Sequence, residues 1–192
     1  MARNLIKNPS GEGKLAFWKL TENNGVGMMV EDIPGACGHD INLVGVRKFF
    51  ATSFELCLKS QLIDLLAEGY SAEQLDSQPV VAVEDWYSGR KDCGSVYQIT
   101  VQLLDENKEV IARFQPLQKT LDPEQSPWTQ VIHTFSHYGR GLRFVSFEHG
   151  GKDTKFWKGW YGVRVTGSSV KLFHPLKGPL GSDGPTVEEE GL

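Results

Sequence analysis

Four aromatic side chains and a lysine stand close together in one short, glycine-rich stretch, residues 149–162. The aromatic residues of this stretch are Phe156, Trp157, Trp160 and Tyr161, and the lysine is Lys158. An exposed aromatic ring can cover the apolar face of a sugar or stack on a nucleic-acid base. A lysine beside it can donate hydrogen bonds to hydroxyl or acetyl oxygens. These residue types therefore favour a binding site for a flat, polar ligand.

The same stretch also permits a purely structural role. Trp157 and Trp160 could each close one end of a β-core, with the indole N–H groups bonded to nearby carbonyls. Both locations are common for tryptophan, so the sequence favours neither role. Gly150 and Gly151 predict a turn into a loop. Tyr161, Val163 and Val165 alternate with smaller or polar residues, and this pattern predicts a half-buried strand directly after that loop.

A second informative stretch, residues 85–94, separates two predicted strands. An aromatic pair precedes a polar tip that contains glycine, which predicts a hairpin loop. We expect Asp92 to be exposed at this tip. A carboxylate in that position can accept two hydroxyl hydrogens from a sugar.

Catalytic and metal-binding chemistry find little support. A glycosidase needs two carboxylates about 5 Å or about 6.5–9.5 Å apart, and no spacing selects a pair among the candidates Asp85, Asp92, Glu148 and Asp153. The chain has no G-x-S-x-G, phosphate-loop, dinucleotide, C-x-x-C or H-E-x-x-H motif. On an extended strand, His133 and His137 would lie roughly 13 Å apart, too far to share one ion. We therefore predict a protein that is not an enzyme and has no cofactor or metal.

The composition fits a globular protein with a substantial core in 192 residues. Twenty basic and 24 acidic side chains give a net charge of −4, which argues against duplex DNA, and we predict no nucleic-acid partner. No run approaches the roughly 20 apolar residues of a membrane span, and the N-terminus lacks the apolar core of a signal peptide. Cys37, Cys57 and Cys93 are an odd and sparse set, typical of reduced thiols, so we predict a cytoplasmic location.

Many short predicted strands favour an antiparallel β-sandwich. Residues 96–114 contain two alternating runs around a charged turn, which predicts a hairpin. Residues 57–69 are ambiguous, because their composition favours a helix but an apolar run this short also permits a strand. We predict that residues 1–174 form the sandwich and that the Pro-, Gly- and acid-rich residues 175–192 form a disordered tail.

Eight runs of residues, in order and with few gaps, resemble the F-box-associated domain of the sugar-recognising F-box proteins. They are Arg3-Asn4-Leu5, Asn8-Pro9, Ala67-Glu68-Gly69-Tyr70, Asp85-Trp86-Tyr87-Ser88-Gly89-Arg90, His133-Thr134-Phe135, Arg143-Phe144-Val145, Phe147-Glu148-His149-Gly150-Gly151 and Trp157-Lys158-Gly159-Trp160. The likeness covers about residues 3–173. It implies a sandwich of about ten antiparallel strands, similar to jelly-roll, galactose-binding-domain-like modules that bind carbohydrate. It also implies a strand over residues 61–68.

Glycan-binding members of that family hold the inner chitobiose of N-linked high-mannose chains with loops at one end of the sandwich. The resemblance places this contact at Phe54, Asp92, Phe156, Trp157 and Lys158. It implies that Trp157 stacks on an N-acetylglucosamine ring, with Phe54 and Phe156 as an apolar wall. Asp92 and Lys158 would supply directed hydrogen bonds. Relatives with alanine at the lysine position bind glycans weakly or not at all, so Lys158 favours binding. Phe156 stands where the best-known binder has tyrosine, so a hydroxyl is missing.

No F-box precedes Arg3 in this sequence. We therefore expect either a free-standing lectin or the substrate-recognition part of an SCF-type ubiquitin ligase in glycoprotein quality control. The expected partners are N-linked high-mannose glycoproteins, and a ligase core only if a longer chain supplies the F-box. The alternative is a protein–protein interaction module of the same fold without a glycan ligand, because aromatic loops also form interface hot spots.

Overall fold

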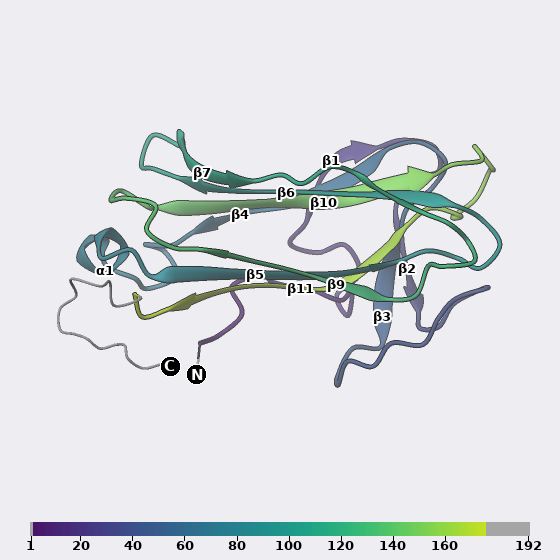
Figure 1. Cartoon of the computed structure of the whole chain (residues 1–192), viewed down its shortest axis with the longest axis horizontal. Coiled ribbons are helices and arrows are strands. Elements are labelled where there is room, and N and C mark those ends of the chain that lie inside the picture. The colour runs from purple at the N-terminus through teal and green to yellow at the C-terminus, as the bar shows by residue number, and fades with distance from the viewer. Residues whose placement is uncertain (1, 176–192) are drawn as a thin grey trace.

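The computed structural model describes residues 2–175, in which eleven strands and one short helix are found. The strands form two antiparallel sheets that pack face to face, seen as the upper and lower layers of Figure 1. The antiparallel β-sandwich predicted from the sequence is therefore confirmed. The proposed boundary at residue 174 and the disordered tail stay predictions, because residues 176–192 lie outside the described residues.

The first sheet has the strand order β1-β4-β10-β6-β7, and β8 also pairs with β6. Its strands are β1 (Lys19–Asn23), β4 (Cys57–Asp64), β6 (Ser95–Leu104), β7 (Val110–Phe114), β8 (Lys119–Leu121) and β10 (Phe144–Asp153). The second sheet has the order β2-β3-β11-β5-β9. Its strands are β2 (Met29–Asp32), β3 (Lys48–Ala51), β5 (Val80–Ser88), β9 (Thr129–Phe135) and β11 (Arg164–Phe173). Helix α1 (Ala72–Asp76) lies at one end of the sandwich.

The core fills the space between the two sheets. Successive side chains of a strand point to opposite faces, so alternate residues of the central strands enter this space. Val101 of β6, Phe147 of β10 and Val165 of β11 are fully buried there. Each such side chain contributes roughly 1.5–3 kcal/mol through removal from water, which is why strands of this pattern pair into a sandwich.

The ambiguous segment forms a strand. Residues 57–64 make up β4, which lies between β1 and β10. Pairing on both sides stabilises an extended backbone here and overrides the helical composition. The strand ends at Asp64, and residues 65–69 form a turn, so the strand implied over residues 61–68 is correct only for its first half.

Gly150 and Gly151 do not open a loop, contrary to the prediction from the sequence. Both lie within β10, paired with β4 on one side and β6 on the other. A Cβ atom on Gly150 would lie 2.0 Å from the Cys57 carbonyl oxygen, and one on Gly151 would lie 1.8 Å from the Val96 carbonyl oxygen. Glycine is required because neighbouring backbones approach too closely for any side chain.

The loop predicted over residues 85–94 is shorter than expected, and the predicted hairpin is wrong, because β5 belongs to the second sheet and β6 to the first. Asp85, Trp86 and Tyr87 belong to β5, and only residues 89–94 connect it to β6. β5 lies between β11 and β9, and this pairing continues to Tyr87. The pairing partners on both sides extend the strand beyond what its own sequence pattern indicated.

A row of polar side chains crosses the core between the sheets. Lys59 Nζ lies 2.8 Å from His149 Nε2, and His149 Nδ1 lies 2.5 Å from the Asp85 carboxylate. The same carboxylate accepts hydrogen bonds from the Tyr97 hydroxyl at 2.7 Å and the Ser168 hydroxyl at 2.8 Å. The side chains of Lys59, His149 and Asp85 are buried. We call these five residues the buried polar row.

The hydrogen bonds of the row indicate one arrangement of protons. Burial lowers the pKa of Lys59 well below its usual value, and the Asp85 charge opposes this effect. Burial also lowers the pKa of His149, so its imidazole is neutral at pH 7. A neutral His149 that accepts from Lys59 through Nε2 carries its proton on Nδ1 and donates it to Asp85. Lys59 Nζ also lies 3.0 Å from the centre of the Trp18 ring, a cation–π contact that stabilises the ammonium form.

Candidate functional site

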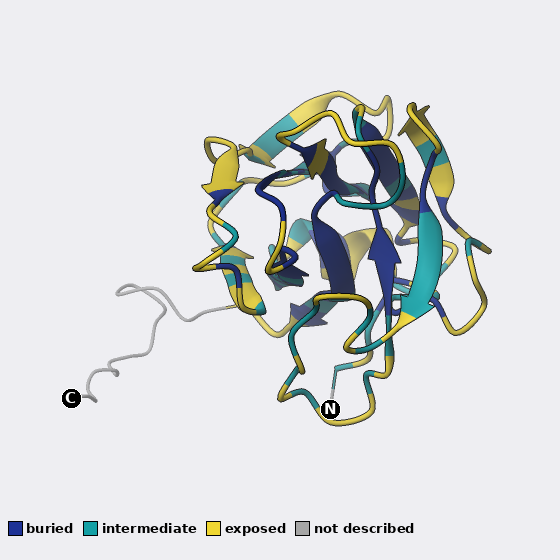
Figure 2. Cartoon of the chain, turned by 90° about the vertical axis from the view of Figure 1, so that its right-hand side faces the viewer, coloured by how far each residue is buried: buried dark blue, intermediate teal, exposed yellow. Residues whose placement is uncertain are grey.

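Three loops meet at the end of the sandwich opposite α1, on the right of Figure 1 and toward the viewer in Figure 2. They are residues 52–56 between β3 and β4, residues 89–94 between β5 and β6, and residues 154–163 between β10 and β11. All five site residues predicted from the sequence lie on these three loops. We call this surface the loop end.

Backbone hydrogen bonds hold the loops to one another. The Thr154 N–H donates to the Gly94 carbonyl at 3.0 Å, which joins the third loop to the second. The Gly162 N–H donates to the Thr52 carbonyl at 3.1 Å, which joins the third loop to the first. The 154–163 loop is therefore bound at both of its ends, and its side chains have a fixed base.

Asp153 shapes the start of this loop. Its buried side chain accepts hydrogen bonds through Oδ1 from the N–H groups of Lys155 at 2.8 Å and Phe156 at 2.6 Å. An aspartate that bonds the backbone two and three residues onward makes a tight turn. Phe156 completes the turn at a φ of +60°, a conformation rare for a bulky residue. The turn leaves the Phe156 side chain 68% exposed.

Phe54 and Phe156 are in contact across the first and third loops. Their ring centres lie 5.2 Å apart with the planes at 82°, an edge-to-face arrangement that aromatic pairs prefer. Phe54 is half-buried, whereas Phe156 is exposed. The structure thus brings together the two residues that the resemblance assigned to an apolar wall.

Trp157 and Trp160 have different roles. The Trp160 N–H donates to the Gly27 carbonyl at 3.0 Å, and its ring is half-buried. Trp160 therefore has the structural role that was one of the two alternatives from the sequence. Trp157 is 43% exposed. Its ring meets Tyr161 edge-on, with 5.3 Å between ring centres and 88° between planes. Trp157 therefore presents aromatic surface to solvent in an orientation that Tyr161 supports.

Asp92 is paired with Arg90. Its two carboxylate oxygens accept from Arg90 Nε and Nη2, each at 2.8 Å. The Arg90 guanidinium holds the pKa of Asp92 below its usual value. The Asp92 side chain is 35% exposed, as expected of a tip residue, but its charge is neutralised, which the sequence did not predict. A carboxylate has about four lone-pair sites, so both oxygens can still accept from a ligand.

Arg90 and Tyr161 join the candidate site in the structure, although the residues predicted for glycan contact did not include them. The Arg90 guanidinium lies 4.2 Å from the centre of the Tyr161 ring. A continuous series of contacts thus runs from Trp157 through Tyr161 and Arg90 to Asp92, across two loops. Both residues stand within or beside the stretches that the sequence singled out, but only the fold brings them together. Lys158, on the same loop, is exposed and its ammonium can donate three hydrogen bonds.

The four carboxylates considered for a glycosidase are each engaged elsewhere. Asp85 belongs to the buried polar row, Asp153 holds the loop backbone, and Asp92 is paired with Arg90. Glu148 accepts a hydrogen bond from the Thr21 hydroxyl at 2.8 Å. Within residues 2–175, no three His, Cys, Asp or Glu residues are grouped so that they could hold a metal ion. The described part of the chain also has no helix long and apolar enough to cross a membrane.

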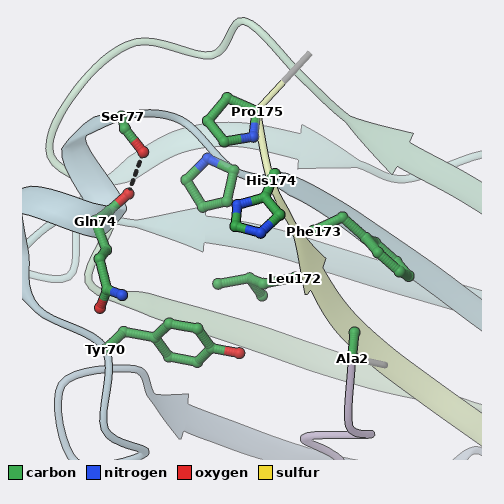
Figure 3. Close-up of a pocket in the computed structure, with 9 residues that line it drawn as sticks. Ala2, Tyr70, Gln74, Ser77, Leu172, Phe173, His174 and Pro175 are labelled. Carbon is green, nitrogen blue, oxygen red and sulfur yellow. Dashed lines mark hydrogen bonds between the residues drawn. The ribbon is translucent and has the colours of Figure 1, made fainter.

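A hollow of about 510 Å³ opens at the opposite end of the sandwich (Figure 3). It is lined by residues from the two ends of the described chain and from the segment around α1: Ala2, Tyr70, Gln74, Ser77, Pro79, Leu172, Phe173, His174 and Pro175. The Ser77 hydroxyl donates to the Gln74 carbonyl, and the Gln74 side chain accepts from the Ser71 N–H. These polar groups serve to end and begin α1, so we place the candidate site at the loop end.

The chain is similar to proteins of one family. A model described as "F-box associated region" matches residues 1–172. F-box only protein 2 of Bos taurus is 51% identical over 172 residues, which cover 88% of this chain and 58% of that protein. F-box only protein 6 of Homo sapiens is 48% identical over 170 residues, covering 88% of this chain and 58% of the relative. The chain therefore spans somewhat more than half the length of these two relatives.

Solved structures share the fold at low sequence identity. The CBM22-1 xylan-binding domain of Paenibacillus barcinonensis Xyn10C matches with a TM-score of 0.51 and 11% identity over 91% of this chain and 97% of that domain. The enzymatically active domain of bacteriophage CBA120 tailspike protein 4 matches with a TM-score of 0.60 and 12% identity over 88% of this chain and 21% of that one. These likenesses show a common β-sandwich architecture.

Proposed function

The chain belongs to the F-box-associated family, and from this premise we propose that it binds the chitobiose core of N-linked high-mannose glycans. The domain acts as a lectin-like module and carries out no reaction. The observation that carries the proposal is the exposed Trp157 ring at the loop end, beside the exposed Phe156. The xylan-binding domain named above supports the idea that this architecture can present a carbohydrate site.

The chemistry of the loop end suits an N-acetylglucosamine ring. One face of a pyranose consists mainly of C–H groups, which lose water when they stack on a flat aromatic ring. Trp157 supplies that ring, and the contact between Phe54 and Phe156 supplies an apolar side for the acetamido methyl group. The hydroxyl and carbonyl oxygens need directed partners around this apolar centre.

Two charged residues at the edge of this surface can provide those partners. The Lys158 ammonium donates to hydroxyl or acetamido oxygens. Asp92 accepts from sugar hydroxyls through the lone pairs that Arg90 does not use, and the Arg90 pairing holds the carboxylate in one orientation. A salt-bridged carboxylate has already lost part of its hydration, so contact with a sugar costs less desolvation.

The relatives are longer F-box only proteins. We therefore further propose that the domain selects N-linked high-mannose glycoproteins for an SCF-type ubiquitin ligase, acting in the cytoplasm in glycoprotein quality control, with the ligase core bound through an F-box. A free-standing lectin with the same site is the other form of this proposal. Co-precipitation of the ligase core with the full-length natural protein, in the presence of a competing glycan, distinguishes these two forms.

Calorimetric titration with di-N-acetylchitobiose and with a Man₃GlcNAc₂ glycan tests the glycan site. A shallow surface site predicts a dissociation constant on the order of micromolar to millimolar, about −8 to −4 kcal/mol. Trp157→Ala should weaken binding by a factor of about 5 to 150, since stacking on one aromatic ring is worth roughly 1–3 kcal/mol. Lys158→Ala should weaken it by a smaller factor, because one charge-assisted hydrogen bond is lost.

Phe173→Ala provides a matched control. Phe173 is 47% exposed, similar to Trp157, but it is the last residue of β11 and pairs with Val80, at the end away from the loops. Its replacement should leave the sugar affinity unchanged. Absence of binding heat with both sugars would contradict the proposal. If a protein partner then binds the Trp157 loop without competition from chitobiose, the domain is a protein–protein interaction module.

A further inference from the structure

Strand β9 ends the second sheet and presents an unusually open edge. It pairs with β5 along its whole length, from Thr129 opposite Tyr87 to Phe135 opposite Val81, with no shift of register. Its sequence, Thr-Gln-Val-Ile-His-Thr-Phe, contains no charged side chain and no proline. Ile132 at its centre is 64% exposed. A regular, uncharged edge of this kind is a template for pairing with another strand.

The other four edge strands of the described chain carry features that prevent such pairing, and the shortest of them, β8, has only three residues and begins with Lys119. β1 contains Lys19 and Glu22 and has a shift of register in its pairing with β4. β7 contains Arg113 and also has a shift of register. β2 is only four residues long and ends in Glu31 and Asp32. Charges, irregularities and short length protect an edge from unwanted partners. β9 has neither a charged side chain nor a shift of register, so its edge lacks this protection.

The sequence of β9 is complementary to itself. If two copies pair antiparallel about Ile132, this residue faces its own copy and Gln130 faces Thr134. On the other face of the strand, Val131 lies opposite His133. Paired β-branched residues and paired hydrogen-bonding side chains stabilise neighbouring strands, whereas like charges placed opposite each other destabilise them. Symmetry would bring any charge near the axis close to itself, and β9 has none.

We propose that two copies of this chain associate through β9, forming one continuous sheet across a two-fold axis at Ile132. The exposed Ile132 side chain is covered in this pairing, and the free edges of both β9 strands acquire backbone partners. The contact is confined to one strand from each copy. Interfaces this small are weak or transient, so the dimer forms at high local concentration.

The geometry of such a dimer has a consequence for ligand binding, which rests on the proposed function. Antiparallel strands run in opposite directions, so the two loop ends lie at opposite ends of the assembly. The two glycan sites cannot meet on neighbouring sugars of one chain. A dimer links two glycoproteins, or two distant glycans of one large glycoprotein, and gains affinity through the second contact.

A cysteine at the axis tests the register directly. In a Cys37→Ser background, which removes the exposed native thiol, Ile132→Cys places two thiols opposite each other with Cβ atoms about 4.5–5.5 Å apart. Mild oxidation should therefore give a disulfide-linked dimer. In the same background, Gln130→Cys places the two thiols four residues apart along the strands, roughly 13 Å, so this variant should not form the disulfide. Equal cross-linking of the two variants would overturn the proposal.

Sedimentation equilibrium supplies a second test without cysteines. The wild-type chain should pass from monomer to dimer between roughly 1 and 300 μM, as expected of a small interface. Ile132→Lys brings two ammonium groups together at the axis and should weaken association at least tenfold. Val110→Lys is the matched control, because Val110 is 44% exposed on the edge strand of the other sheet. A wild-type chain that stays monomeric throughout, or an equal effect of both lysines, overturns the proposal whether or not the chain binds sugar.

Discussion

Replacing Asp85 by asparagine tests whether the buried polar row holds the two sheets together through charge. Asp85 lies on β5 of the second sheet and accepts from Tyr97 and His149 of the first. Asparagine has nearly the same shape, so the packing is preserved. The carboxylate charge is lost, and the buried Lys59 ammonium no longer has an opposite charge nearby.

The expected loss of stability follows from the burial of both groups. The side chains of Asp85 and Lys59 are both completely buried, so water cannot replace the missing charge. Removal of one partner from a buried charge pair costs about 3–5 kcal/mol. With a urea dependence of roughly 2 kcal/mol per molar, the unfolding midpoint should fall by about 1.5–2.5 M.

Urea unfolding at pH 7 measures this change, with two further variants as references. Asp32→Asn removes an exposed carboxylate from its pair with Lys48 and should leave the midpoint nearly unchanged. Asp85→Asn combined with Lys59→Met removes both charges and should recover more than half of the loss, because an apolar replacement of a buried pair is often neutral. An Asp85→Asn midpoint within about 0.5 M of wild type would refute the electrostatic reasoning.

The pH dependence of the same variant separates charge from packing. Burial lowers the pKa of Lys59, and Asp85 opposes this shift, so the pKa of Lys59 falls further in Asp85→Asn. Between this lowered pKa and the unfolded value near 10.5, the unfolded chain binds a proton that the folded chain does not. Stability therefore rises with pH in this window. The deficit of Asp85→Asn should shrink as the pH rises through the lowered pKa of Lys59, whereas a packing defect would stay constant.

Two further predictions concern β10. Burial lowers the pKa of His149, so only the unfolded chain takes up this proton as the pH falls below 6.5, and stability should decrease by up to about 1.4 kcal/mol per pH unit. An equal urea midpoint at pH 7.0 and pH 5.5 contradicts this. Gly150→Ala would place its Cβ 2.0 Å from the Cys57 carbonyl oxygen and should cost about 3 kcal/mol or more. Gly13→Ala, whose nearest neighbour atoms lie at 3.5 Å, should have little effect in the same thermal or urea assay, and equal losses would count against the close-contact argument.

The sequence predicted the fold class because alternation is a local signal that the sandwich preserves. The hairpin over residues 96–114 is found as β6 and β7. Residues 57–64 could not be assigned from alternation, since their extended form depends on β1 and β10, which are distant in the sequence. The turn predicted at Gly150-Gly151 is wrong for the same reason. Glycine is required there by the close approach of β4 and β6, which are distant in the sequence.

The site was predictable in its aromatic part and not in its electrostatic part. The cluster of aromatics in a glycine-rich segment is visible in the sequence, and in the structure Phe156 and Trp157 lie at the surface. The pairing of Asp92 with Arg90 depends on the turn within one loop, and the contact of Arg90 with Tyr161 depends on how two loops meet. Side chains two residues apart, such as Arg90 and Asp92, come together only because of the turn between β5 and β6.

Strand β10 connects the stability of the core to the shape of the candidate site. His149 belongs to the buried polar row, the two following glycines permit close pairing with β4 and β6, and Asp153 fixes the turn that exposes Phe156. These features lie within five consecutive residues of one strand, which pairs with β6 along this whole stretch. A substitution at His149 should therefore disturb the loop as well as the core. A loss of binding in a Trp157 variant therefore reports on the site itself, because Trp157 projects from the loop. A loss of binding in a variant of the β10 residues that position this loop also reflects their effect on stability.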